Sequence, residues 1–180
     1  MNQVYDPTFV NCMVMKSTGH SIFLFTSVYA SPQASKRRFL WNQLVRLNPG
    51  NTVPWLLRGD FNVILKPDEG TGCSHRHTNG SHLFTDFLSS MGLWDISFRG
   101  PTFTWSRGNL HQRLDRCVAN ARWKYSFMSA HVTLLDGLGL NHRPLLVSLH
   151  EEFNHHINRS FRFINAWQSH PNFNDFLKGV

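Results

Sequence analysis

Four short polar segments carry the side chains of this chain that could do chemistry. Carboxylate side chains can position a water molecule, and tyrosine, amide and histidine side chains can donate hydrogen bonds to developing negative charge. Each segment falls at or just after the end of a predicted strand, where an α/β sheet presents its functional groups. The four in this order are a far more specific signal than any one of them alone. They are Ser27-Val-Tyr29-Ala, Arg58-Gly-Asp60-Phe-Asn62, Thr102-Phe-Thr104-Trp-Ser followed by Arg113-Leu-Asp115, and Leu140-Asn141-His142-Arg-Pro.

The elements that must position these segments are strands and helices in mixed order. Runs rich in Val, Ile, Phe and Thr predict strands, and leucines or phenylalanines at helical spacing predict amphipathic helices. Ser35 begins one predicted helix, which Asn48-Pro-Gly50 ends, and Ser81 caps a second. The apolar run 53–57, ending at Gly59-Asp60, suits a strand that is buried on both faces. The predicted strands are 9–15, 21–29, 53–57, 102–106 and 113–118 (a pair around residues 107–109), 131–135 and 145–149, with a short helix over 121–128.

Two polar stretches could be functional sites, but each is better interpreted as a solvent-exposed segment. Residues 66–82 form a predicted polar loop whose Cys73, His75, His77 and His82 could suggest zinc. Their spacing fits no standard zinc finger, so a solvated loop is the preferred interpretation. The run Lys36-Arg37-Arg38 is interpreted as a solvated helix face, with contact to nucleic acid as the alternative.

Composition and charge restrict the class of protein. The 180 residues are 41% hydrophobic and 16% charged, which is typical of a folded domain. Lys and Arg number 18 against 11 Asp and Glu, and the resulting charge of +7 favours a polyanionic partner. Three widely spaced cysteines argue against a disulfide scaffold and for a reducing compartment. No apolar run approaches the roughly 18 residues of a membrane span, and the first residues lack a secretory-signal pattern, so we expect an intracellular protein.

With these motifs in order, the sequence resembles the endonuclease/exonuclease/phosphatase superfamily, and most closely the endonuclease domain of plant LINE-type non-LTR retrotransposons. Trp55–Leu65 is similar to the family's Gly-Asp-Phe-Asn strand, Arg113-Leu-Asp115-Arg to its later Asp motif, and 161–173 to the segment that leads into a reverse transcriptase. The resemblance implies a DNase I-like α/β fold, a sandwich of two mixed or antiparallel sheets flanked by helices, incomplete at the N-terminus. Residues 1–150 would be the C-terminal two-thirds of that domain, and 151–180 a linker and partial helix.

The resemblance also implies a Mg²⁺-dependent phosphodiester hydrolase that nicks DNA, nuclear where it functions. Asp60 would orient or deprotonate the attacking water, and Asn62 would hold the scissile phosphate. Tyr29 would lie beside that phosphate, Asp115 would orient His142, and His142 would stabilise the developing negative charge. Thr104 and Arg113 are the implied substrate-binding residues.

Two departures from the family pattern predict a weakened or inactive site. Asn141 stands where the family has a metal-linked Asp before the histidine, and an amide has no charge to attract a hard cation. The early Asn and the metal-ligating Glu of the family have no counterpart upstream of Met15.

Other interpretations stay open from the sequence. The chain could be a non-catalytic basic module that binds nucleic acid, a superfamily phosphatase, or a decaying gene copy without a selected role. Asp60 could be a turn residue, His142 a hydrogen-bonded loop histidine, and Tyr29 or Trp105 a packing residue.

Overall fold

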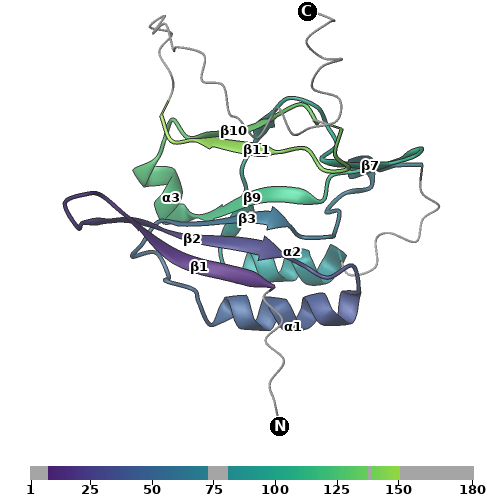
Figure 1. Ribbon diagram of the computed structural model, residues 1–180. Helices are drawn as coiled ribbons and strands as arrows, with labels where there is room; N and C mark the ends of the chain where they lie inside the picture. The colour runs from purple at the N-terminus through teal and green to yellow at the C-terminus, as the bar shows by residue number, and fades with distance from the viewer. Residues whose placement is uncertain (1–7, 73–80, 138, 151–180) are drawn as a thin grey trace, which may run out of the picture.

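A computed structural model describes residues 8–72, 81–137 and 139–150. Its largest element is a five-stranded sheet in the order β1-β2-β3-β9-β5, in which β2 and β3 run parallel and the other neighbours antiparallel. In Figure 1 this sheet crosses the middle of the molecule, with helices below it and further strands above it. Its strands are β1 (Phe9–Met15), β2 (Ser21–Tyr29), β3 (Trp55–Asp60), β9 (Asp115–Asn120) and β5 (Leu93–Asp95).

Two helices cover one face of this sheet. Helix α1 (Ala34–Val45) is the crossover between the parallel strands β2 and β3, and α2 (Ser81–Ser90) lies beside it. Each helix buries one apolar stripe, as the helical spacing of its leucines and phenylalanines predicts. The first hydrophobic core lies between these helices and the sheet, and its largest side chains are Trp41, Trp55, Phe61, Phe84 and Phe87.

A second sheet packs on the other face and completes a sandwich. It has the order β11-β10-β6, with β10 antiparallel to β11 and parallel to β6. The second core joins the two sheets through Leu56, Cys117 and Ala119 on one side and Val132, Leu134 and Leu145 on the other. This mixed α/β sandwich with few flanking helices confirms the predicted DNase I-like fold class. The remaining elements of this layer are β10 (His131–Leu134), β11 (Leu145–Ser148), β6 (Phe98–Arg99) and α3 (Ala121–Ser126).

A third, small sheet corrects one predicted strand pair. β7 (Trp105–Arg107) pairs with β8 (Leu110–Gln112), and β8 pairs with β4 (Gly70–Thr71). The predicted turn around 107–109 is confirmed, and Gly108 in it has a φ of +59°, but the strand that pairs across it is 110–112 and not the predicted 113–118. The residues that follow enter β9, which pairs with β3 in the large sheet.

Other predicted elements differ at their ends. The strand predicted over 53–57 begins at Trp55, after a proline that cannot donate to the ladder, and continues to Asp60. The predicted polar loop contains the short helix η1 (Pro67–Glu69), and Glu69 is buried. Its Cys73, His75 and His77 lie outside the described residues.

The basic run at the start of α1 is only partly solvated. Lys36 and Arg38 are exposed, but Arg37 is 5% exposed, so its interpretation as a solvated residue is wrong. The Arg37 guanidinium donates to the carbonyl oxygens of Ser31 and Pro32, at 3.1 and 2.7 Å. A cation can be buried here because it saturates carbonyls that the turn before α1 leaves unpaired.

Two of the cysteines fall within the described residues, and both are free thiols. Cys12 is exposed on β1, whereas Cys117 is buried in the second core. Burial raises the pKa of the Cys117 thiol to about 12, which keeps it protonated and unreactive. Within the part of the chain that the structure describes, no helix has the length and apolarity needed to cross a membrane.

Gly59 allows β2 and β3 to approach at the end that carries the polar segments. Its φ is +149°, and a Cβ placed there would stand 1.8 Å from the Val28 carbonyl oxygen. No side chain fits that space, so glycine is required for the neighbouring Asp60 to reach its place in the sheet.

Gly59→Ala is therefore expected to lower the free energy of unfolding by about 3 kcal/mol or more, because the added methyl must push β2 and β3 apart. Gly108→Ala is the matched control, since Gly108 also has a positive φ but meets nothing within 4 Å, and it should cost about 1 kcal/mol. Urea unfolding of the two variants measures the difference. Equal losses would show that backbone conformation, not the close approach, sets the requirement at position 59.

Candidate active site

Strand register places three of the predicted site residues in one row across the large sheet. Tyr29 is the parallel partner of Asp60, and Asp60 is the antiparallel partner of Asp115. Directly opposed residues in neighbouring strands have their Cβ atoms about 5 Å apart on the same face. Two carboxylates and a phenol therefore stand side by side, with the Tyr29 side chain 64% exposed and Asp60 only 8% exposed.

Asn62 closes a tight turn directly after Asp60. Its φ of +49° lies in the left-handed region, which asparagine tolerates better than most residues. The Asn62 backbone N–H donates to Asp60 Oδ1 at 2.8 Å, and its Nδ2 donates to Asp60 Oδ2 at 2.8 Å and to the Ala30 carbonyl at 2.9 Å. These bonds fix the orientation of the Asp60 carboxylate.

The environment of Asp60 makes it a weaker acid than usual. Burial, and next the negative charge of Asp115, raise its pKa from 3.8 to about 6, although the hydrogen bond from the Asn62 N–H and the charges of His142 and Arg37 oppose the rise. A carboxylate with a pKa near 6 is ionised at neutral pH and is a better proton acceptor than an ordinary aspartate.

Asp115 and His142 form a hydrogen-bonded pair. His142 Nδ1 lies 2.9 Å from Asp115 Oδ2, and the histidine side chain is 42% exposed. An ionised carboxylate only accepts, so Nδ1 carries the proton and Nε2 is the nitrogen left for a ligand. The pair joins the two sheets of the sandwich, because Asp115 begins β9 and His142 precedes β11.

One cavity of about 400 Å³ collects most of these groups. Tyr29, Asp60, Asn62 and His142 line it, together with Trp105, which the sequence favours as a packing residue. The Trp105 and His142 rings lie 6.5 Å apart, and their backbones form an isolated bridge. The remaining wall is largely apolar, with Pro32, Val63, Ile64, Leu110 and Leu114 beside Gln112.

Asp115 bonds His142 but does not line this cavity, and three other predicted site residues also lie away from it. Thr104 is 1% exposed, and its hydroxyl oxygen accepts from the backbone N–H groups of Leu114 and Asp115, each at 2.9 Å. Arg113 is buried in ion pairs. Asn141 is exposed, and its backbone carbonyl accepts from the Ser106 N–H at 2.9 Å.

Arg113 belongs to a buried charge cluster on the helix side of the site. Arg113 forms a fork with Asp95, with N–O distances of 2.6 and 2.8 Å, and it also bonds Glu69 at 2.9 Å. Arg116 contacts the same two carboxylates, including a close bond to Glu69 Oε2. Burial alone would raise the pKa of Glu69, but the hydrogen bond and charge of Arg116, the Leu65 N–H and Arg113 lower it to about 2.

Sequence reasoning missed Glu69, Asp95 and Arg116 because each lies in a segment with another plausible interpretation. Glu69 falls in a stretch that reads as a polar loop, and Asp95 ends a strand of three residues. The spacing of Arg113 and Arg116 around Asp115 is the available signal, since two cations near a sheet interior require carboxylate partners.

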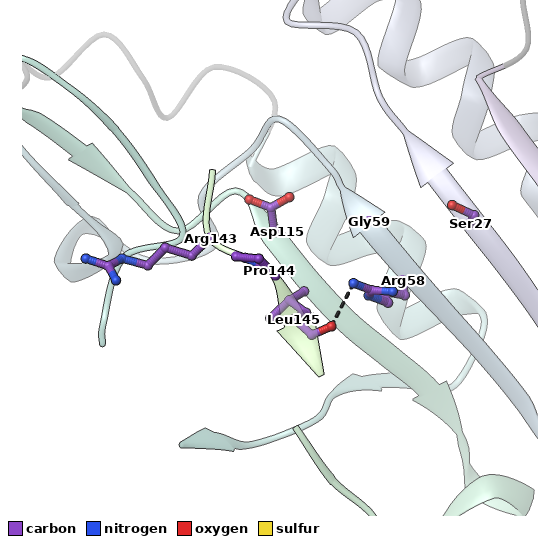
Figure 2. A pocket seen from close by; sticks show the side chains of 7 residues that line it. All are labelled: Ser27, Arg58, Gly59, Asp115, Arg143, Pro144 and Leu145. Atoms are coloured by element: carbon purple, nitrogen blue, oxygen red, sulfur yellow. Dashed lines mark hydrogen bonds between the residues drawn. The ribbon is translucent and has the colours of Figure 1, made fainter. Parts of the chain in front are cut away.

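A second cavity, of about 230 Å³, lies on the other side of Asp115, between the two sheets. Figure 2 shows Arg58 donating to the Leu145 carbonyl, at 2.7 Å, while the Arg143 guanidinium turns away from Arg58. Arg143 instead reaches Asp136 at 3.3 Å. The two cations do not converge, so this cavity lacks the paired donors of an anion site.

The described residues do not fit a self-contained Mg²⁺ site. Across residues 8–72, 81–137 and 139–150, no three His, Cys, Asp or Glu side chains gather closely enough to hold a metal ion. Asp115 is bonded to His142, and both oxygens of Asp60 accept from Asn62. Mg²⁺ prefers several oxygen ligands in near-octahedral geometry, and Asp60 alone offers too few.

Replacing Asp60 tests its raised pKa. The folded protein holds the Asp60 proton more tightly than the unfolded chain does. Ionisation of Asp60 therefore lowers the free energy of unfolding as the pH rises from about 4 to 6, and the full loss remains above pH 6. Asp60→Asn has no charge here and does not undergo this loss. The unfolding free energy of the variant minus that of the unsubstituted chain should therefore rise by up to about 3 kcal/mol between pH 4 and pH 7.5. Urea unfolding in EDTA measures this change. Asp86→Asn, on the exposed face of α2, is the control, and an unchanged difference for Asp60→Asn would contradict the raised pKa.

Glu69 has the opposite pH dependence. Its lowered pKa contributes stability above pH 4.5 that is lost as the pH falls toward 2. Glu69→Gln is expected to lower the unfolding free energy at pH 7 by about 3 to 5 kcal/mol, since it leaves two buried guanidiniums short of charge, and the loss should shrink toward pH 2. Asp136→Asn, in an exposed pair, should change little. A Glu69→Gln loss that stays constant from pH 7 to pH 3 would refute the charge argument.

Two solved structures share this arrangement of sheets and helices. The endonuclease domain of TRAS1, a telomere-specific non-LTR retrotransposon, has a TM-score of 0.55 and 17% identity, over 79% of this chain and 62% of that one. Beta toxin from Staphylococcus aureus has a TM-score of 0.52 and 14% identity, over 78% of this chain and 56% of that one. The chain thus spans less than two thirds of either structure, and identities this low show the fold alone. No curated protein sequence matches the chain.

The sequence itself provides the family. The sequence model of the Endonuclease/Exonuclease/phosphatase family matches residues 7–137, which hold β1 to β10 and most of the described cavity. Together with the sandwich fold, this match shows that the chain belongs to the endonuclease/exonuclease/phosphatase family.

Proposed function

We propose that this chain is a phosphodiester hydrolase of the endonuclease type, with DNA as its substrate. One observation carries the proposal: Tyr29, Asp60, Asn62 and His142 line a single cavity, and Asp115 orients His142 by a 2.9 Å hydrogen bond. A buried carboxylate, a carboxylate-bound histidine and nearby hydrogen-bond donors are the groups that hydrolysis of a phosphodiester requires.

Each residue has a distinct part in this proposal. The Asp60 carboxylate accepts a proton from the attacking water, whose oxygen bonds to phosphorus as the bond to the leaving sugar oxygen breaks, and that sugar oxygen takes a proton from solvent water. His142, protonated on both ring nitrogens, donates its Nε2–H to the negative charge that develops on the phosphate, while its Nδ1–H donates to Asp115. Asn62 and Tyr29 position the phosphate beside Asp60.

We propose that the activity is weak and needs Mg²⁺ at high concentration. The family resemblance implies Mg²⁺, but the described residues do not form a site for it, and Asn141 brings an amide instead of a carboxylate. The proton transfer to Asp60 and the charge stabilisation by His142 are steps that the chain's own residues perform.

Several features favour DNA as the substrate over a small phosphate ester. The net charge of +7 suits a polyanion. Arg107, at the end of β7, and Lys66 are exposed cations near the segments that line the cavity. The fold neighbour TRAS1 is an endonuclease domain of a retrotransposon, which is consistent with a chain that once preceded a reverse transcriptase and acted in the nucleus. Residues 151–180, the proposed link to that enzyme, lie outside the described residues.

Nicking of supercoiled plasmid DNA tests the proposal. With Mg²⁺, the unsubstituted chain should nick slowly, and Asp60→Ala should reduce the rate by roughly 100-fold or more, because the proton acceptor is lost. Asp86→Ala, on the exposed face of α2, should nick as fast as the unsubstituted chain, and EDTA should stop all three.

Other results would favour another function. Salt-sensitive DNA binding without nicking, unchanged in Asp60→Ala, would indicate a non-catalytic nucleic-acid-binding module. Phosphate release from small esters without plasmid nicking would indicate a phosphatase. Nicking that Asp60→Ala leaves intact would contradict the assigned role of Asp60.

A further inference from the structure

Thr104 lies out of reach of a substrate but at the centre of a backbone network. Its side chain is 1% exposed and does not line the active-site cavity. A hydroxyl oxygen has two acceptor lone pairs, and the N–H groups of Leu114 and Asp115 use both, each at 2.9 Å. The substrate contact that the family resemblance implies for Thr104 is therefore not available in this arrangement.

The same residue bonds both segments that carry the Asp115–His142 pair. On one side, its hydroxyl holds the backbone of Asp115 itself. On the other side, its carbonyl oxygen accepts from the Arg143 N–H at 2.8 Å, one residue after His142. Its own N–H donates to the Gln112 carbonyl at 3.0 Å, which anchors it to β8.

The residues after Thr104 extend this connection. The Ser106 N–H donates to the Asn141 carbonyl at 2.9 Å, and Trp105 forms a backbone bridge with His142. The segment from Thr104 to Ser106 thus lies between the start of β9 and the His142 segment, and it sets the distance between them.

We propose that Thr104 is a positioning residue, which holds Asp115 against His142 and so keeps the Nδ1–H of His142 bonded to Asp115 and its Nε2 directed toward the substrate. This inference rests on the proposed hydrolase function for its consequence in catalysis, but the hydrogen-bond geometry that carries it does not depend on that function.

The test compares two substitutions of Thr104, one that removes the hydroxyl group and one that removes the methyl group. Thr104→Val keeps the shape but removes the acceptor, and it leaves two buried N–H groups unpaired. Thr104→Ser keeps the acceptor and removes only the methyl group. The expected nicking rate falls roughly 10- to 100-fold in Thr104→Val, because a small displacement of the Asp115–His142 pair is costly. Thr104→Ser should nick about as fast as the unsubstituted chain, and Thr85→Val, at an exposed threonine of α2, controls for the exchange itself.

A second readout does not depend on nicking. The ¹⁵N shifts of the His142 ring, assigned through their loss in His142→Gln, should show Nδ1–H in the unsubstituted chain and in Thr104→Ser. Thr104→Val should show a mixture of tautomers. If Thr104→Val is unfolded by circular dichroism, Thr104→Ser decides: a folded Ser variant with the Nδ1–H signature supports the proposal, and one without it overturns it.

The two proposals can fail separately. A folded Thr104→Val that keeps the unsubstituted His142 signature would overturn the positioning role, whatever its nicking rate. An unsubstituted chain that does not nick DNA, but whose His142 signature responds to Thr104→Val as expected, would remove the proposed function and leave the positioning role intact.

Discussion

The register of β2, β3 and β9 is the constraint on which the active site depends. Side chains alternate between the faces of a sheet, so a slip of one residue in β3 would turn Asp60 from the cavity to the helix side. Specific polar contacts between neighbouring strands, away from the site, hold the register. Trp55 donates its backbone N–H to Asn120 Oδ1 at 2.9 Å and its indole N–H to Thr26 Oγ1 at 2.8 Å, and Thr26 donates to Asn11 Oδ1 at 2.7 Å. A chain of specific bonds across four strands has one satisfied register, and that register aligns Tyr29, Asp60 and Asp115.

The two buried carboxylates beside β9 have different neighbours: Glu69 is paired with arginines, whereas Asp60 faces another carboxylate. Glu69 and Asp60 are both largely buried, yet the pKa of Glu69 is lowered to about 2, whereas that of Asp60 is raised to about 6. The difference comes from the neighbours, because Glu69 has two guanidiniums within hydrogen-bond distance and Asp60 has another carboxylate across the strand pair. A buried carboxylate that is fully paired with cations stabilises the fold, whereas a carboxylate buried beside a like charge is prepared to accept a proton or a cation. Of the two carboxylates beside β9, Glu69 therefore stabilises the fold, and Asp60 is the one suited to proton transfer.

The sequence predicted the fold class better than it predicted the individual elements. The order of the motifs and the strand pattern were sufficient for the sandwich and for four of the eleven residues that line the cavity, since Asp60, Asn62 and His142 belong to motifs that short stretches of sequence define. The turn between β7 and β8 was predicted, but the second strand was misplaced, because 110–118 form a nearly continuous strand-like run that is divided between β8 and β9 in two different sheets. Burial was also beyond the sequence: nothing local distinguishes Arg37, which binds carbonyls inside the protein, from its exposed neighbours. The roles implied for Thr104 and Arg113 depended on exposure, which only the packed structure provides.

Because Asp115 and His142 come from different sheets, their pairing depends on the packing of the sandwich. Asp115 belongs to the five-stranded sheet, and His142 lies just before β11 in the three-stranded sheet. The second core holds these sheets together through apolar contacts such as Leu56 and Ala119 with Val132 and Leu145. Loosening that core would separate the histidine from its carboxylate before it disturbed Asp60 and Asn62, which are bonded within one turn. The site thus has a locally determined half, which the Gly-Asp-Phe-Asn motif builds alone, and a half that exists only when the sandwich is closed. Thr104 bonds the second half on both sides, which is why a buried hydroxyl without access to substrate can govern the geometry of the exposed histidine.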